Sequence, residues 1–318
     1  MIKTIINLIS LFFCYWNAFT FSVACARVYR DIPFVSWNKR KNFYEKRILE
    51  YLREFIQKNC KNTQYQTNDI ENQDVNSETI WVMWWQGVEG MPPIVRACWN
   101  QLNKVSSSHK IILITKENWR NYIQLPNYII EKVNKGKITL THFSDIIRIY
   151  LLNYYGGLWI DATVWVEDLP YYCFNNRLFT LHGPGMFPDF ISRGEWVPFF
   201  LGTNERNYKL FSNINIILLN YWEKHNVLID YLLIDYLIFL IYNNNNDIFQ
   251  DINSLKINKD FYILNSCINN TYVENDFEEM MKKSPLQKLS YKNKFIQIDK
   301  LGNLTNYGYI LKITLDND

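Results

Sequence analysis

Residues 143–163 read Phe-Ser-Asp-Ile-Ile-Arg-Ile-Tyr-Leu-Leu-Asn-Tyr-Tyr-Gly-Gly-Leu-Trp-Ile-Asp-Ala-Thr, and this stretch decides the fold. Residues 144–155 are apolar on nearly all sides, which is typical of a buried helix. Gly156 and Gly157 end that helix, and the apolar residues 158–160 form a short strand that stops at Asp161. A helix that leads directly into a buried strand predicts a layered α/β architecture.

Polar side chains in this stretch form a candidate binding site. Asp145 and Arg148 are three residues apart, so they share one face of the predicted helix. We expect Ser144 to cap the helix, which places both charged residues in its first turns, where unpaired backbone N–H groups attract an anion. The arginine can fork onto phosphate, and the aspartate can accept hydrogen bonds from sugar hydroxyls. A purely structural ion pair is the alternative interpretation.

Asp161 and Thr163 follow the predicted strand and are candidate metal ligands. They are two residues apart, so they face the same way if the strand continues. A carboxylate at a strand end, beside a phosphate-binding helix, suits Mg²⁺ or Mn²⁺ held between the protein and a diphosphate. Such a cation would neutralise a nucleoside-diphosphate leaving group as a glycosidic bond breaks.

Strands and helices alternate around this stretch. Residues 80–85 are a continuous apolar run, as in the buried strands of a parallel sheet, and residues 110–115 are predicted to form a second buried strand around the apolar residues 111–114. Further predicted elements are helices at 92–102, 119–123, 128–134, 213–223 and 228–242 and a strand at 199–201. The alternation predicts an α/β fold with a mostly parallel sheet flanked by helices.

Residues 143–163 resemble the S-D-x-x-R … G-G-x-x-x-D-x-D core of glycosyltransferases with a DXD sugar-binding region, a group similar to glycosyltransferase family 32. The stretch looks closest to the bacterial capsular polysaccharide synthesis proteins, and the resemblance covers roughly residues 81–242. It implies a GT-A fold, which is the Rossmann-like fold of nucleotide-diphospho-sugar transferases. It also implies a nucleoside-diphosphate sugar as donor and a divalent cation, Mn²⁺ or Mg²⁺.

The resemblance assigns roles to individual residues of this chain. Asp145 and Arg148 would bind the donor sugar and phosphate, and Asp161 would join the cluster of ribose, sugar and metal. Trp85, at the end of the first strand, would stack near the base, with core filling as the alternative. The implied set is catalytic Asp161, Asp145 and Arg148, donor-binding Trp85, Ser144, Asp145, Arg148, Gly156, Gly157, Trp159 and Asp161, and metal-binding Asp161 and Thr163.

Thr163 stands where the family motif has its second aspartate, and a hydroxyl is a poorer metal ligand than a carboxylate. Three arrangements are then open. Asp161, phosphate and water hold the metal, or another carboxylate completes the site, or the metal is absent. The candidates for an extra carboxylate are Asp189, Glu195, Asp230 and Asp235. A lone histidine, His182, is a further polar candidate, although such a residue is more often structural.

Composition excludes some partners. The 318 residues carry 34 basic and 31 acidic side chains, and this net charge of +3 is too small to indicate nucleic-acid binding. The six cysteines are scattered and include no CxxC pair, so we expect free thiols rather than a zinc cluster. Aromatic residues make up 17%, which suits carbohydrate and nucleotide sites as well as ordinary cores.

The first 27 residues are interpreted as a hydrophobic membrane anchor or interfacial helix, because residues 4–26 carry no charge. The basic residues after this segment place the rest of the chain at the cytoplasmic face of a bacterial cell membrane. A cleaved signal peptide, ending at Ala24-Cys25-Ala26, is an alternative that would put the chain in a secretory-pathway lumen. A soluble helix packed on the domain is the third interpretation.

The remainder divides into three segments. Residues 28–77 form an amphipathic helix, expected near 39–58, and a polar linker. Residues 78–246 form the predicted GT-A domain, and residues 247–318 are expected to extend it, with short β-like runs at 261–264 and 295–298.

Together these features predict an enzyme that transfers a sugar from a nucleoside-diphosphate donor to a hydroxyl of a glycan acceptor in capsular or surface polysaccharide synthesis. We expect that acceptor to be a growing, lipid-linked glycan at a membrane surface. Two other functions remain open: a non-catalytic sugar-nucleotide-binding protein, suggested by Thr163, and a subunit that assembles membrane enzymes.

Overall fold

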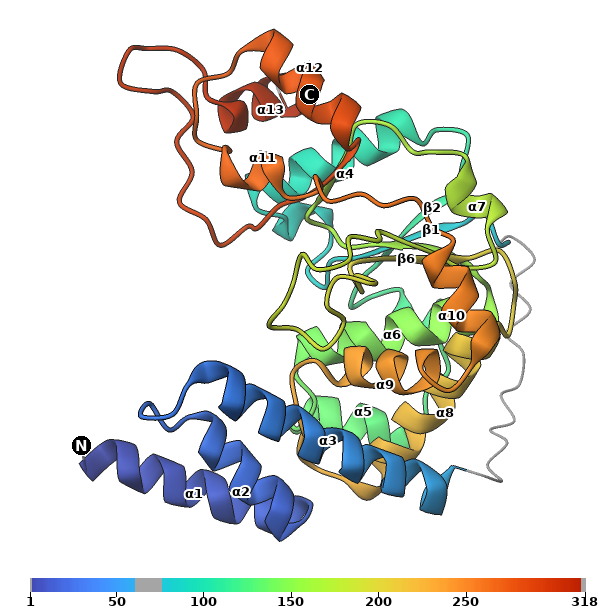
Figure 1. Ribbon diagram of the computed structural model, residues 1–318. Helices are drawn as coiled ribbons and strands as arrows, with labels where there is room; N and C mark the ends of the chain where they lie inside the picture. Colours follow the sequence, from blue (N-terminus) through green and yellow to red (C-terminus); the bar gives the residue numbers. More distant parts are fainter. Residues whose placement is uncertain (1, 61–75, 316–318) are drawn as a thin grey trace.

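A five-stranded sheet forms the centre of the molecule in the computed structural model, which describes residues 2–60 and 76–315 (Figure 1). Its strand order is β2 (Ile111–Ile114), β1 (Ile80–Met83), β3 (Gly157–Ile160), β6 (Phe200–Thr203), β5 (Phe179–Thr180). β1 pairs in parallel with β2 and β3, whereas β6 is antiparallel to both β3 and β5. Four strands therefore run one way and β6 runs against them, which confirms a mixed α/β fold with a mostly parallel sheet.

Helices cover both faces of this sheet (Figure 1). On one side lie α5 (Asn127–Asn134), α6 (Leu140–Tyr154), α8 (Lys209–Lys224) and α9 (Leu233–Tyr242). On the other side lies α4 (Pro93–Val105), with α11 (Ile263–Ser266), α12 (Glu274–Lys283) and α13 (Asn306–Leu315) beyond it. The shorter elements are the 3₁₀ turns Val88–Gly90 and Trp119–Asn121 and the helices α7 (Tyr172–Asn175) and α10 (Asn246–Asn253). The helix expected at 119–123 is thus only a 3₁₀ turn.

The alternation of side chains along the strands divides the core into two layers. Trp81 of β1 and Trp159 of β3 are fully buried among the helices α6, α8 and α9. Ile80 and Val82 point to the opposite face and pack with residues of β4 (Val164–Val166) and the following loops. Both faces are covered, which explains why these strands read as unbroken apolar runs.

The connection between α6 and β3 depends on two glycines. Gly156 and Gly157 have φ angles of 71° and 89°, in the left-handed region that favours glycine. A Cβ on Gly157 would lie 2.3 Å from the carbonyl oxygen of Thr79, which accepts a hydrogen bond of 2.9 Å from Leu158 N. The chain therefore returns from the helix to pair with β1 only because no side chain stands here.

The N-terminal segment folds as two helices, α1 (Ile2–Ala18) and α2 (Phe21–Arg30), instead of one continuous helix. The break follows from Thr20, whose hydroxyl accepts a hydrogen bond from the backbone N–H of Val23 and starts α2. Within residues 2–60 and 76–315, no helix combines the length and the apolar character needed to cross a membrane.

The next helix, α3 (Trp37–Asn59), confirms the helix expected near residues 39–58 and packs against α2 and α9. Its buried face includes Tyr44, Ile48 and Leu52. Most of the polar linker expected after it falls in residues 61–75, which lie outside the described residues.

The C-terminal region contributes a strand that no sequence pattern indicated, and this strand belongs to a second, two-stranded sheet. β7 (Leu286–Lys288) pairs antiparallel with β4, with Lys288 opposite Val164. α13 packs along α4, so the end of the chain covers that side of the molecule. The β-like runs expected at 261–264 and 295–298 are not strands: the first leads into α11, and the second has one isolated bridge at Ile298.

The glycine at position 157 gives a stability prediction. Gly157→Ala forces its methyl group onto the carbonyl of Thr79, so we expect a loss of more than about 4 kcal/mol in unfolding free energy, or no soluble protein. Gly302→Ala is the matched control, because Gly302 also has a positive φ of 85° but open space around it. We expect it to cost only about 1 kcal/mol in urea unfolding. Equal losses in the two variants would contradict the close approach of β1 and β3.

Candidate active site

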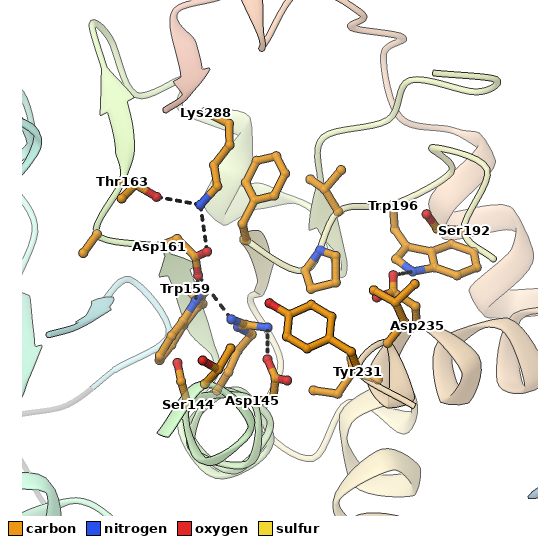
Figure 2. Close-up of a pocket in the computed structure, with 18 of the residues that line it drawn as sticks. Ser144, Asp145, Trp159, Asp161, Thr163, Ser192, Trp196, Tyr231, Asp235 and Lys288 are labelled. Carbon is orange, nitrogen blue, oxygen red and sulfur yellow. Dashed lines mark hydrogen bonds and ion pairs between the residues drawn. The ribbon is translucent and has the colours of Figure 1, made fainter. Parts of the chain in front are cut away.

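A pocket of about 440 Å³ opens at the carboxyl ends of β1 and β3 (Figure 2). Its walls come from α6, the turn after β3, the segment 187–199, the start of α9 and β7. Pockets at this edge of a parallel sheet are the usual ligand sites of α/β proteins, and this volume is in the range of a small-molecule site.

A chain of charged contacts crosses the floor of this pocket. Arg148 donates from one terminal nitrogen to Asp145 Oδ1 at 2.9 Å and from the other to Asp161 Oδ1 at 3.1 Å. Lys288 Nζ donates to Asp161 Oδ2 at 2.9 Å and to Thr163 Oγ1 at 2.7 Å. The structure thus brings Asp145, Arg148, Asp161 and Thr163 together, as the sequence predicted, and adds Lys288 (Figure 2).

Asp161 is the centre of this cluster. Trp159 donates its indole N–H to Asp161 Oδ1 at 2.9 Å, and the Arg148 guanidinium lies 4.9 Å above the Trp159 ring. Burial alone would raise the pKa of the Asp161 carboxyl. Lys288, Arg148 and the Trp159 hydrogen bond outweigh burial and lower that pKa below its ordinary value. Asp161 is therefore an anion held by two cations.

The prediction that Ser144 caps the helix is wrong. α6 begins at Leu140, and the hydroxyl of Thr139 accepts a hydrogen bond from His142 N as the cap. Thr139 lies five residues before Ser144, so the helix starts more than one turn earlier than the sequence predicted. Ser144 lines the pocket from inside the helix, so any anion here is held by side chains and not by the unpaired backbone N–H groups of a helix start.

Behind Asp145 a buried pair of aromatic residues supports the site. Trp222 of α8 donates its indole N–H to His142 Nε2 at 2.9 Å. The other ring nitrogen, Nδ1, lies 3.4 Å from Asp145 Oδ2 and makes no hydrogen bond with it. Both aromatic side chains are buried, and they form the core side of the site behind the Asp145 carboxylate.

Lys288 is the residue of the site that the sequence analysis missed. It follows Thr163 by 125 residues, and no motif surrounds it. Only the pairing of β7 with β4 brings it to the pocket. Its side chain is 16% exposed, with Nζ 4.9 Å from the centre of the Phe199 ring.

The structure separates the four candidate extra carboxylates, and of these only Asp235 lines the pocket. Asp230 binds Arg30 at 3.0 Å and Tyr44 at 2.8 Å, and it precedes α9 rather than lying within it. Asp189 accepts from the Trp37 indole at 2.7 Å. Glu195 lies 3.6 Å from His182, which is itself absent from the residues that line the pocket.

Asp235 lies in the first turn of α9 and faces the pocket on the side across from Asp161. Trp196 donates its indole N–H to Asp235 Oδ1 at 3.0 Å. Burial raises the pKa of the Asp235 carboxyl to about 7, even though this hydrogen bond works in the opposite direction. Figure 2 shows the ring of Tyr231, which is 70% exposed, between Asp235 and the Asp161 side of the pocket.

Two groups of predicted donor-binding residues lie away from the pocket. β1 ends at Met83, and the next side chain in the pocket is Trp84, whereas Trp85 packs edge-on against Phe143 at 5.7 Å. Trp85 therefore fills the core, which was the alternative to stacking near the base. Gly156 and Gly157 shape the turn at the amino end of β3, while Trp159 and Asp161 line the pocket at the carboxyl end of that strand.

The residues around Asp161 do not form a ready divalent-cation site. Within residues 2–60 and 76–315, no group of three or more His, Cys, Asp or Glu side chains is placed to hold a metal ion. The ammonium of Lys288 lies between Asp161 and Thr163, where the sequence placed the cation. Metal binding by these two residues stays a prediction, and it requires Lys288 to move.

Asp235 gives a prediction about stability and pH. Its folded pKa of about 7 exceeds the ordinary 3.8, so the folded protein binds this proton more tightly than the unfolded chain. Stability therefore falls as pH rises between these values, by up to about 1.4 kcal/mol per pH unit. Asp235→Asn keeps an acceptor for Trp196 and removes the proton. Urea unfolding from about pH 4 to pH 8 should show a smaller decline in the variant; parallel curves would contradict the raised pKa.

Comparison with known proteins identifies the family to which the chain belongs. No curated protein and no solved structure is significantly similar to the chain. The sequence profile of the family described as capsular polysaccharide synthesis protein matches residues 31–309, a range that includes α6, β3, β7 and every residue of the charged cluster. The chain therefore belongs to the capsular polysaccharide synthesis protein family.

Proposed function

We propose that this protein is a GT-A glycosyltransferase that moves a sugar from a nucleoside-diphosphate donor to a glycan hydroxyl in capsular polysaccharide synthesis. The observation that carries the proposal is the meeting of Arg148 and Lys288 at Asp161, at the carboxyl end of β3. Two cations at such a place suit the diphosphate of a sugar nucleotide. The family supplies the biological setting.

The walls of the pocket support a donor of this kind. Its aromatic side chains are Trp84, Trp159, Phe187, Phe190, Trp196, Phe199, Tyr231, Tyr262 and Tyr291. Flat aromatic faces pack on sugar rings and nucleobases, while a few polar groups fix the orientation of the ligand. Asp145 and Ser144 offer oxygen atoms to the sugar hydroxyls, and the cations offer donors to the phosphates.

Asp235 suits the acceptor side of the reaction. A carboxylate whose pKa is near the working pH can accept the proton of an attacking hydroxyl. In this scheme the acceptor oxygen bonds to the anomeric carbon and its proton passes to Asp235. The bond from that carbon to the diphosphate breaks, and the nucleoside diphosphate leaves with the electron pair. Arg148 and Lys288 stabilise the charge that develops on it.

Thr163 favours a second candidate function, a sugar-nucleotide-binding protein without turnover. A third candidate, a subunit that assembles membrane enzymes, requires no donor binding. Donor binding and turnover of the unsubstituted protein separate the three functions, and a substitution of Asp161, which lies against both cations in the pocket, tests whether turnover depends on this site.

Asp161→Asn removes the anion that orients Arg148 and Lys288 and keeps the size of the side chain. We expect turnover of the matching sugar nucleotide to fall by about 100-fold or more, because the two cations lose the carboxylate that aligns them for the transition state. The measurement is release of nucleoside diphosphate from UDP- and GDP-sugars, with thermal shift as the binding readout.

The exposed Asp276 of α12 supplies the control, and Asp276→Asn should leave turnover unchanged. Donor binding without turnover in the unsubstituted protein would favour the second candidate function. A folded protein that neither binds nor consumes any sugar nucleotide would favour the third candidate, a subunit that assembles membrane enzymes.

The same proposal places α1 on a membrane surface, near a lipid-linked acceptor at the cytoplasmic face. Ile6, Ile9, Phe13 and Trp16 are each between 46% and 58% exposed, and they recur at helical spacing on one side of α1. No charged residue interrupts residues 4–26, so a lipid interface fits this side better than a charged partner.

Vesicle binding tests that placement. The double variant I9E/F13E puts two charges on the exposed side of α1, and we expect the fraction bound to anionic phospholipid vesicles to fall by about tenfold or more. Leu301→Glu is the matched control, because Leu301 is 86% exposed but lies in the C-terminal region. Equal co-sedimentation of the two variants and the parent protein would contradict an interfacial role for α1.

A further inference from the structure

The position of Lys288 bears on how the diphosphate is neutralised. Its Nζ lies 2.9 Å from Asp161 Oδ2 and 2.7 Å from Thr163 Oγ1, so one ammonium bridges the two side chains that a divalent cation would bridge. An ammonium has three N–H donors, and these two contacts use two of them. One donor is left for a ligand in the pocket that Lys288 lines.

Asp161 has little capacity left for a metal ion. Its Oδ1 accepts from both Arg148 and Trp159, and its Oδ2 accepts from Lys288. A cation bound to the same carboxylate would have to displace Lys288 or lie within a few ångströms of a like charge. Neither is favourable, since the pocket is partly shielded from water.

Thr163 is consistent with a cation supplied by the protein. The ammonium needs only a neutral acceptor at this position, and the threonine hydroxyl provides one. A second carboxylate here would make three with Asp145 and Asp161, opposed by only two cations. The threonine therefore keeps the charges of the cluster balanced at two against two.

The backbone fixes Lys288 where it is. Lys288 is opposite Val164 in the β4–β7 pair, its N–H donates to Phe261 O at 2.7 Å, and its ammonium lies over the Phe199 ring. A side chain held by a strand is placed before the ligand arrives, which is the condition for electrostatic stabilisation of a leaving group.

We propose that Lys288 does the work of the divalent cation, so that this protein binds a nucleoside diphosphate through Lys288 and Arg148 without a metal ion. The inference rests on the proposed donor site but goes beyond it, because it specifies what neutralises the diphosphate.

The test is isothermal titration of the full-length protein with UDP, GDP, ADP and dTDP, in EDTA and again with added Mn²⁺ or Mg²⁺. We expect one nucleoside diphosphate to bind in EDTA with a Kd that added metal leaves unchanged. Lys288→Met should weaken that binding by about tenfold or more, and Lys288→Arg should retain most of it. Lys282→Met, on the exposed side of α12, is the matched control and should bind normally.

A second variant tests the metal dependence of nucleotide binding, which would not change if Lys288 had only a structural role. T163D/K288M replaces the ammonium with a carboxylate beside Asp161, so nucleotide binding should return only when Mn²⁺ is present. Metal dependence would thus appear in the variant and be missing from the parent protein.

Three results would overturn the inference. Binding by the parent protein that requires metal would overturn it and leave the donor site intact. A Kd for Lys288→Met equal to that of Lys282→Met would do the same. A folded parent protein that binds no nucleoside diphosphate, with or without metal, would remove the proposed function and this inference together.

Discussion

The pairing of Asp161 with Arg148 and Lys288 is the interaction on which the account of this site depends. Asp161 and Arg148 come from one helix–strand unit, α6 and the turn after β3, whereas Lys288 comes from β7, so the ion pair with Lys288 ties this unit to a strand 127 residues away. A partly buried carboxylate needs such partners, and removing one would leave an uncompensated charge. The same two cations line the pocket, so the arrangement that satisfies Asp161 also suits the anionic ligand that we propose.

The position of this cluster depends on the close approach of β3 to β1. Gly157 lets β3 approach β1, which carries Asp161 to the carboxyl edge of the sheet beside α6. The buried Trp222–His142 pair lies behind Asp145 on the core side. Family membership supports a role in capsular polysaccharide synthesis, and the proposed reaction is argued from the residues of the site.

Much of the fold could be predicted from local patterns, because apolar runs and the diglycine turn reflect short-range physics. The same patterns located Asp145, Arg148, Asp161 and Thr163, since all four lie within 19 residues of one helix–strand unit. The start of α6 was misplaced because Thr139 and Ser144 are both good caps, and only the hydrogen bond to His142 N distinguishes them. Lys288 could not be found in this way, because no motif surrounds it. It reaches the site only through the pairing of β7 with β4, which joins segments more than one hundred residues apart.

The most direct measurement is a crystal structure of the full-length protein with the nucleoside diphosphate that it binds best. The account predicts density for the diphosphate in contact with Arg148 and Lys288, and for the base against the aromatic wall that includes Trp84. A nucleotide bound elsewhere on the molecule, or one whose phosphates touch neither cation, would contradict the central claim that this pocket is a sugar-nucleotide site.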